Sequence, residues 1–285
     1  MKLKDLVVPP GKKIRLKSYD PGYTGQFKSK KSARKKLKQD VKKLAEYQDV
    51  LYAQNMYGVL LIFQALDAAG KDGAIKHVMS GVNPQGCEVY SYKAPSAEEL
   101  DHDFLWRYAQ DLPERGRIGI FNRSYYEEVL VVRVHPDILA KQQLPPQVKK
   151  DGTLWKDRFE QINNFEKYLT ENGVVIVKFF LNVSKKEQKR RFLERISLPD
   201  KNWKFSATDA QERRYWNAYR RAYEDTFSHT STKWAPWYII PADHKWFTRT
   251  AIADIIISRI KALKLSYPTV TRERKQSLLK VKRTL

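Results

Sequence analysis

Cysteine and long apolar segments are almost missing from this chain of 285 residues. Cys87 is the only cysteine, so no disulfide can form within the chain, and a reducing compartment is favoured. The first five residues have no apolar core, so no signal peptide is expected. The longest apolar runs are strand-length, well below the roughly 20 residues that a membrane-spanning helix needs. These absences argue against a disulfide-stabilised scaffold and a membrane-spanning protein, and they predict a cytoplasmic location.

Acidic residues are scarce relative to basic ones. The chain has 32 Asp and Glu against 54 Lys and Arg, which gives a formal charge of +22. Its hydrophobic content of 42% is ordinary for a folded protein, so global disorder is not expected. Such an excess of positive charge indicates a polyanionic partner, but charge alone does not choose among nucleic acid, an acidic membrane surface and a phosphate polymer.

Apolar segments of strand type alternate with segments of helical periodicity, which is typical of a parallel sheet covered by helices on both faces. The clearest strand, 174–181, begins as a continuous apolar run, as expected when both faces of a sheet are buried. An amphipathic helix with a basic outer face is expected from Ser29. The other expected strands are 58–63, 87–91, 117–122 and 237–240, and the other expected helices are 71–80, 97–110, 124–131, 153–171, 184–196, 209–225 and 244–262.

The two ends of the chain differ from the region between them. Residues 1–28 are rich in Lys, Pro and Gly and are expected to lie extended over the surface. Residues 266–285 form a basic tail that is expected to be loosely held. The region between them shows no interdomain linker, so 29–265 is predicted to be one α/β domain.

The segment 59–73 has the composition of a phosphate-binding loop: a buried strand, a turn of small residues and a helix that begins near Lys71. Backbone N–H groups and the helix N-terminus attract a phosphate, and Lys71 adds a full positive charge. The Walker A pattern is imperfect, because Ala65 replaces its first glycine and Asp72 replaces its usual Ser or Thr. A turn with an incidental lysine is the alternative. The other predicted phosphate-binding residues of the loop are Ala68, Ala69, Gly70, Asp72 and Gly73.

The end of the third strand carries a second group of polar residues, Asn122 and Arg123, with Glu127 one helical turn beyond. Ligands bind outside the carboxyl ends of strands in an open parallel sheet, so these residues are expected beside the phosphate-binding loop. A Walker B strand normally ends in Asp, and Asn122 is a weaker ligand for a hard cation. The predicted metal ligands are therefore Asp67, Asn122 and Glu127. The alternative is that Asn122 only caps the next helix and that Glu127 is solvated.

A basic segment, about 190–210, has the features of a mobile lid. Arg191 and Arg195 share a helix face, and a polar stretch that ends near Lys204 follows them. Closure of such a segment over a phosphoryl group would exclude water. An ordinary basic helix and loop is the alternative. Lys93, after the second strand, is a further candidate for the phosphate site. Aromatic residues at helical spacing, Tyr215, Trp216, Tyr219 and Tyr223, are expected to belong mainly to the core.

Taken together, three stretches resemble the polyphosphate kinase 2 family: 67–73, 122–127 and the lid-like 191–206. The resemblance runs from about Ser29 to Leu263 and implies a P-loop kinase fold like that of thymidylate kinase, with a helical lid. It also implies dependence on Mg²⁺, inorganic polyphosphate as phosphoryl donor, and assembly into dimers or tetramers. The domain 29–265 is thereby expected to be a P-loop kinase domain that includes the lid.

One departure from the family pattern concerns the acceptor. Many members have Asp-Arg-Ser-x-Tyr-Asn where this chain has Asn122-Arg123-Ser124-Tyr125-Tyr126-Glu127, so the acid and the amide have exchanged places. This arrangement is similar to the class III members, which phosphorylate both AMP and ADP. The resemblance therefore predicts a polyphosphate-dependent nucleotide kinase that converts AMP and ADP to ADP and ATP. We hypothesise that the exchange moves the metal or reshapes the acceptor pocket.

The predicted mechanism relies on electrostatic neutralisation, because the acceptor phosphate is already ionised and needs no general base. Lys71 and the loop amides would hold the transferring phosphates. Asp67 and Glu127 would hold Mg²⁺ with help from Asn122. The arginines expected to stabilise transition-state charge are Arg123, Arg191 and Arg195.

Two other functions remain open at this point. An ATP-dependent nucleoside monophosphate kinase of the same fold explains the loop and the lid but not the large positive charge. A basic nucleic-acid-binding protein explains the charge but treats the loop as incidental. A membrane-surface role has the least support, because the basic helix has few bulky apolar anchors.

Overall fold

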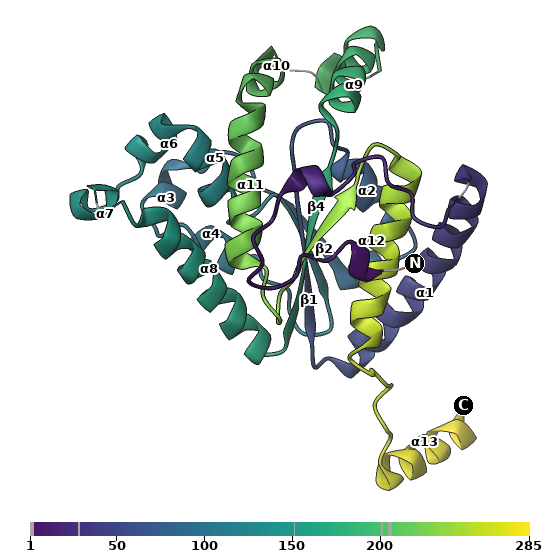
Figure 1. Cartoon of the computed structure of the whole chain (residues 1–285). Helices are drawn as coiled ribbons and strands as arrows, with labels where there is room; N and C mark the ends of the chain where they lie inside the picture. The colour runs from purple at the N-terminus through teal and green to yellow at the C-terminus, as the bar shows by residue number, and fades with distance from the viewer. Residues whose placement is uncertain (1–2, 28, 151, 201, 205–206) are drawn as a thin grey trace.

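A five-stranded sheet forms the centre of the molecule (Figure 1). The computed structural model describes residues 3–27, 29–150, 152–200, 202–204 and 207–285, except for the side chains at 3, 150, 204, 207 and 209. The strand order is β2-β3-β1-β4-β5, and every pair within it is parallel. Each strand lies within two residues of the predicted bounds. The strands are β1 (Gly58–Ala65), β2 (Cys87–Ser91), β3 (Ile118–Asn122), β4 (Val174–Asn182) and β5 (Trp237–Pro241).

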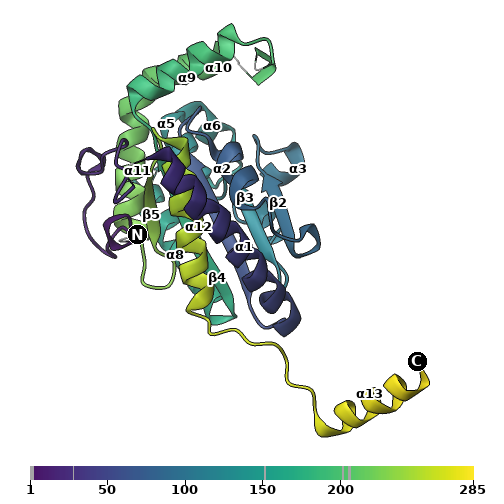
Figure 2. The same ribbon diagram turned by 90° about the vertical axis from the view of Figure 1, so that its right-hand side faces the viewer.

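Helices cover both faces of this sheet (Figure 2), as the sequence predicts. β1 lies at the centre and is almost wholly buried, which explains its continuous apolar run. The first face is covered by α1 (Lys30–Gln54), α2 (Lys71–Val78) and α12 (Lys245–Lys261), and the second by α5 (Glu127–Val134), α8 (Leu154–Glu171) and α11 (Trp216–Thr230). Within the described residues, every helix is too short or too polar to cross a bilayer.

Several helices differ from prediction for local reasons. The expected helix 97–110 is two short helices, α3 (Ala97–Leu100) and α4 (Trp106–Ala109), because the Asp103 carboxylate accepts the Leu105 N–H and starts a new turn. The expected helix 209–225 is divided into α10 (Ala207–Glu212), a 3₁₀ turn (Arg213–Tyr215) and α11. The helices that were not predicted are α6 (Pro136–Lys141), α7 (Pro146–Lys150) and α13 (Arg272–Thr284).

The N-terminal segment does more than lie over the surface. It has two 3₁₀ turns, Leu3–Asp5 and Leu16–Ser18, and it buries four apolar side chains in the core. Val7 forms an antiparallel bridge with Tyr238 of β5, so this segment pairs with the open edge of the sheet. The buried side chains are Leu6, Val8, Ile14 and Leu16.

Candidate active site

The loop between β1 and α2 forms a concave backbone surface at the carboxyl edge of the sheet. Ala68 and Gly70 both have positive φ, 59° and 102°, and the Ala69 N–H donates to the Leu66 carbonyl at 3.2 Å. Left-handed residues in such a turn direct successive N–H groups toward one point, where an anion can bind. Gly70 also supplies the N-cap of α2, whose N-terminal partial charge is positive. This backbone conformation is compatible with the phosphate-binding loop that the sequence predicts.

Lys71 is the first residue of α2, and its side chain turns back toward the loop. Its Nζ donates to the Ala65 carbonyl at 3.4 Å. Burial lowers the pKa of Lys71, and the nearby positive charge of Arg123 lowers it further. A phosphate in the loop would replace this unfavourable environment with a direct counter-charge.

Arg123 lies next to the loop because β3 pairs with β1 and ends beside it. The Arg123 N–H donates to the Phe63 carbonyl at 3.0 Å, and its φ of 69° is in the left-handed region, which a non-glycine residue rarely adopts. Its guanidinium contacts Glu127 at 3.1 Å and Asp67 at 3.4 Å. These two carboxylates, Glu127 first, raise the pKa of Arg123, so it stays fully charged.

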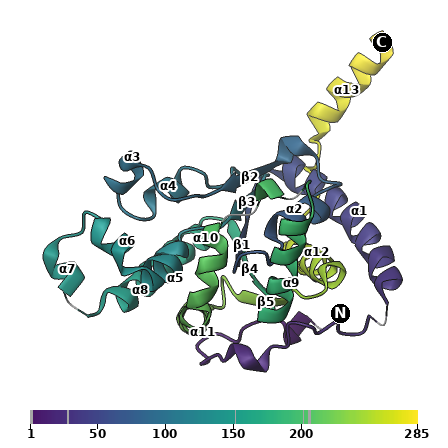
Figure 3. The same ribbon diagram turned by 90° about the horizontal axis from the view of Figure 1, so that it is seen from above.

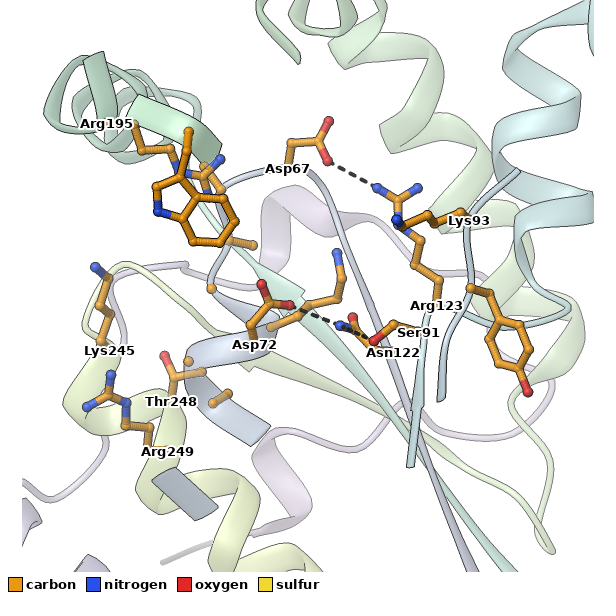
Figure 4. Close-up of a pocket in the computed structure, with 18 of the residues that line it drawn as sticks. Asp67, Asp72, Ser91, Lys93, Asn122, Arg123, Arg195, Lys245, Thr248 and Arg249 are labelled. Carbon is orange, nitrogen blue, oxygen red and sulfur yellow. Dashed lines mark hydrogen bonds and ion pairs between the residues drawn. The ribbon is translucent and has the colours of Figure 1, made fainter. Parts of the chain in front are cut away.

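A cavity of about 650 Å³ that is rich in lysine and arginine opens over this loop. Figure 4 shows Lys245, Thr248 and Arg249 of α12 on one side of it, with Asn122 at the end of β3 and the following Arg123 on another. The predicted residues that line it are Asp67, Ala68, Ala69, Gly70, Lys71, Asp72, Gly73, Lys93, Asn122, Arg123 and Arg195. The Lys204 side chain lies outside the described residues.

Sequence reasoning missed the α12 residues of this cavity. Lys245 and Arg249 are four residues apart on a predicted helix, and that helix directly follows the last strand. The rule that placed Asn122 at the site, that ligands bind beyond the carboxyl ends of parallel strands, applies equally to β5. It could therefore have identified these residues.

Arg191 is a correction to the prediction. It lies in α9 (Lys185–Ser197), is only 4% exposed, and points beneath the loop. Its guanidinium donates to the carbonyls of Ala68 and Ala69, at 3.0 and 2.7 Å, and to those of Ala242 and Asp243. The remaining N–H, on Nε, donates to Glu187 at 2.8 Å. With its donors used in this way, Arg191 holds the loop in place and does not face the cavity; α9 is fixed to the sheet at this residue.

A second, smaller cavity of about 290 Å³ lies on the other side of Arg123. Several elements contribute to its walls, among them the end of β1, α5 and α11. As predicted, Trp216, Tyr219 and Tyr223 are buried, whereas Tyr215 is 43% exposed. The three buried rings also line this cavity, so they contribute both to the core and to a pocket. Asp67 and Arg123 line both cavities and stand at their junction.

The predicted metal ligands are only partly brought together. Asp67 and Glu127 both bind the Arg123 guanidinium, and the Asn122 side-chain amide donates to Asp72 at 2.9 Å. Asn122 Oδ1 is buried without a hydrogen-bond partner in the described part of the chain, and an oxygen in that state fits a hard cation. No group of three or more His, Cys, Asp or Glu in the described ranges could hold a metal alone. A divalent cation here would thus depend on substrate phosphates for further ligands.

The strand–loop–helix cradle follows β1, where the order of the strands along the parallel sheet changes direction. Lysine and arginine side chains surround it. This combination defines an α/β phosphotransferase of the P-loop kinase type. The sequence model described as "Polyphosphate kinase 2 (PPK2)" matches residues 27–268. The chain belongs to the polyphosphate kinase 2 family.

Three relatives illustrate the similarity. The chain is 50% identical, over 100% of its length and 99% of the relative's, to the ADP-polyphosphate phosphotransferase of Rhodopseudomonas palustris. It is 41% identical, over 93% of its length and 96% of the relative's, to the AMP/ADP-polyphosphate phosphotransferase of Meiothermus ruber. The crystal structure of polyphosphate kinase 2 from Arthrobacter aurescens has a TM-score of 0.87 and 37% identity, covering 97% of this chain and 95% of that one.

Proposed function

We propose that this protein transfers phosphoryl groups from inorganic polyphosphate to both AMP and ADP, giving ADP and ATP. The observation that carries the proposal is the position of Arg123 between two unlike cavities. The larger one offers lysine and arginine to a phosphate polymer. The smaller one offers aromatic side chains to a nucleoside. Family membership and the names of the two curated relatives support the same activity.

The chemical difficulty is the repulsion between two polyanions. Unit charges about 4 Å apart repel by roughly 1 kcal/mol in water and by several-fold more in a drier site. Lys71 and the loop N–H groups would hold the phosphate being transferred, and Arg123 would face both substrates at the junction of the cavities. Because the acceptor oxygen is already ionised, neutralisation and in-line positioning supply the rate without a general base.

The proposal includes Mg²⁺ as cofactor. When bound, the ion would neutralise phosphate charge and fix the geometry of the transferring group. Asp67, Asn122 and Glu127 are the residues that would hold it, and Asn122 Oδ1 contributes the buried oxygen that needs a partner. The proposal also includes a homo-oligomeric protein in the cytoplasm.

A single assay tests the activity. Purified protein is incubated with Mg²⁺, long-chain polyphosphate and AMP, and the nucleotides are then separated. ADP is expected first and ATP after it, without added ATP. Turnover that required ATP as donor would instead support the nucleoside monophosphate kinase. If the protein binds RNA or DNA that polyphosphate does not displace, and shows no nucleotide turnover, the nucleic-acid-binding alternative is supported.

The choice of acceptor is tested by restoring the commoner family pattern. The double variant Asn122→Asp/Glu127→Asn moves one negative charge by a helical turn and keeps the local charge constant. We expect the ratio of kcat/KM for AMP to that for ADP to change by about tenfold or more, since pocket contacts of this kind discriminate by that amount.

The two single variants are the matched controls, because each changes the local charge by one unit and neither moves it. An unchanged AMP-to-ADP ratio in the double variant would show that the exchange does not set acceptor choice.

A further inference from the structure

The C-terminal helix α13 is amphipathic and is exposed along its whole length. Thr271 caps it by accepting the Arg274 N–H, and no residue of the helix is buried. Figures 1 and 2 show it projecting away from the sheet and its helices. Leu278, Val281 and Leu285 fall on one stripe by their spacing, and each is about half exposed or more. The basic residues of the segment are Arg272, Arg274, Lys275, Lys280, Lys282 and Arg283.

A cavity of about 780 Å³ has the opposite character, and its lining includes residues of α3, α7, α8 and the turn between α3 and α4. Five carboxylates and only two guanidinium groups line it, in a chain whose net charge is +22. Both arginines are already paired, Arg107 with Glu99 at 3.0 Å and Arg158 with Glu128 at 3.2 Å. The other three acids, Asp101, Asp103 and Asp157, form no ion pair within the described residues, and they leave the cavity mouth acidic.

The same cavity has apolar walls, so it matches the helix in two ways. Its apolar lining can receive a stripe of leucine and valine, and its acids can face the lysines and arginines that flank the stripe. The apolar lining residues are Leu100, Phe104, Leu105, Leu144, Val148 and Leu154.

We propose that α13 of one chain docks in the acidic cavity of a second copy of this protein. In Figures 1 and 3, α13 and the helices around the cavity lie on opposite sides of the molecule, which favours a second copy over the chain's own cavity. Inorganic polyphosphate would bind the basic residues of α13 but leave its apolar stripe exposed to solvent. A bilayer is less favoured, because α13 has no aromatic anchor.

The inference is independent of the proposed phosphoryl transfer. The family match ends at residue 268, before α13 begins, and neither α13 nor the cavity contains a residue of the phosphate-binding site. Variants of the two surfaces should therefore retain the basal activity, which serves as a check of folding.

The test uses two full-length variants with exchanged charge. The cavity variant is Asp101→Lys/Asp157→Lys, and the helix variant is Arg274→Glu/Lys275→Glu/Lys282→Glu. We expect each alone to self-associate about tenfold or more weakly than the parent protein, as measured by light scattering over a range of concentrations. Mixed together, the two restore association, because each basic surface then meets an acidic one.

Two further variants separate docking from non-specific charge effects. Leu278→Ser/Val281→Ser keeps every charge and is expected to weaken association as well. Lys167→Glu changes the charge at an exposed site on α8 that does not line the cavity, and it is expected to leave self-association unchanged.

Three results would overturn the proposal: unchanged association in both variants, no recovery on mixing, or loss in the helix variant alone. If association is lost in the helix variant alone, and the parent protein binds polyphosphate or anionic vesicles through α13, the partner of the helix is that polyphosphate or that membrane surface.

Discussion

Replacing Lys71 by methionine is expected to lower kcat/KM with polyphosphate and ADP by about 10²–10³-fold, the usual cost of removing one preorganised charge from a reacting group. Methionine keeps most of the side-chain length, so α2 should still form. Lys71 is held against the loop, with its Nζ 3.4 Å from the Ala65 carbonyl. The loss should therefore come from the missing charge and leave stability nearly unchanged.

Lys76→Met is the matched control, because Lys76 is exposed on the same helix and does not line the cavity. Steady-state kinetics and thermal unfolding of both variants separate the two effects. Near wild-type activity of Lys71→Met would show that Lys71 does not contact the transferring phosphate. Equal losses in the two variants would show only that helix α2 tolerates no change.

The second large effect is expected at a buried ion pair beneath the site. Lys178 of β4 and Glu166 of α8 are both fully buried, 2.6 Å apart. Glu166 also accepts the hydroxyls of Tyr125 and Tyr126, at 2.9 and 2.8 Å, and these tyrosines closely follow Arg123 in the chain. Burial lowers the pKa of Lys178, which shows the cost of the charge that this network compensates.

Lys178→Met is expected to destabilise the protein by about 3–5 kcal/mol, because it leaves Glu166 buried without its counter-charge. Activity should fall too, since Lys178 no longer donates to the Tyr126 hydroxyl and to Glu166, the carboxylate that holds Tyr125 and Tyr126 beside Arg123. Urea unfolding measures the first effect, and turnover at a temperature where the variant is folded measures the second.

The chain provides its own control in Lys167→Met. Lys167 and Glu171 form an exposed pair 3.8 Å apart, whose loss should cost at most about 1 kcal/mol. The double variant Glu166→Gln/Lys178→Met should recover part of the lost stability, because no unpaired charge remains. If Lys178→Met were no less stable than Lys167→Met, the buried pair would have no special role.

The strands were predictable from the sequence because burial on both faces imposes an unambiguous pattern. β4, for example, is buried from Ile176 to Asn182, so its sequence is a mostly apolar run between turns. The short helices α6 and α7 were missed because five or six residues show too little periodicity. The N-terminal segment was misjudged because Pro, Gly and Lys separate its four buried apolar residues, Leu6, Val8, Ile14 and Leu16.

The candidate site was predictable where backbone position decides function. The rule for parallel sheets places the loop and the end of β3 at one edge, and Lys71, Asn122 and Arg123 do line one cavity there. Side-chain direction was not predictable. Arg191 and Arg195 share a helix face, yet Arg191 turns under the loop and Arg195 lines the cavity. Helical spacing gives the face but not the tertiary neighbours of each residue.

The bridge between Val7 and Tyr238 has a consequence for solubility. β5 is the last strand on its side of the sheet, and a bare outermost strand is a template on which other chains can stack. Here the Val8 N–H donates to the Trp237 carbonyl at 2.8 Å, and the Ile239 N–H donates to the Leu6 carbonyl at 2.8 Å. The first residues of the chain thus act as a built-in guard against fibrous aggregation.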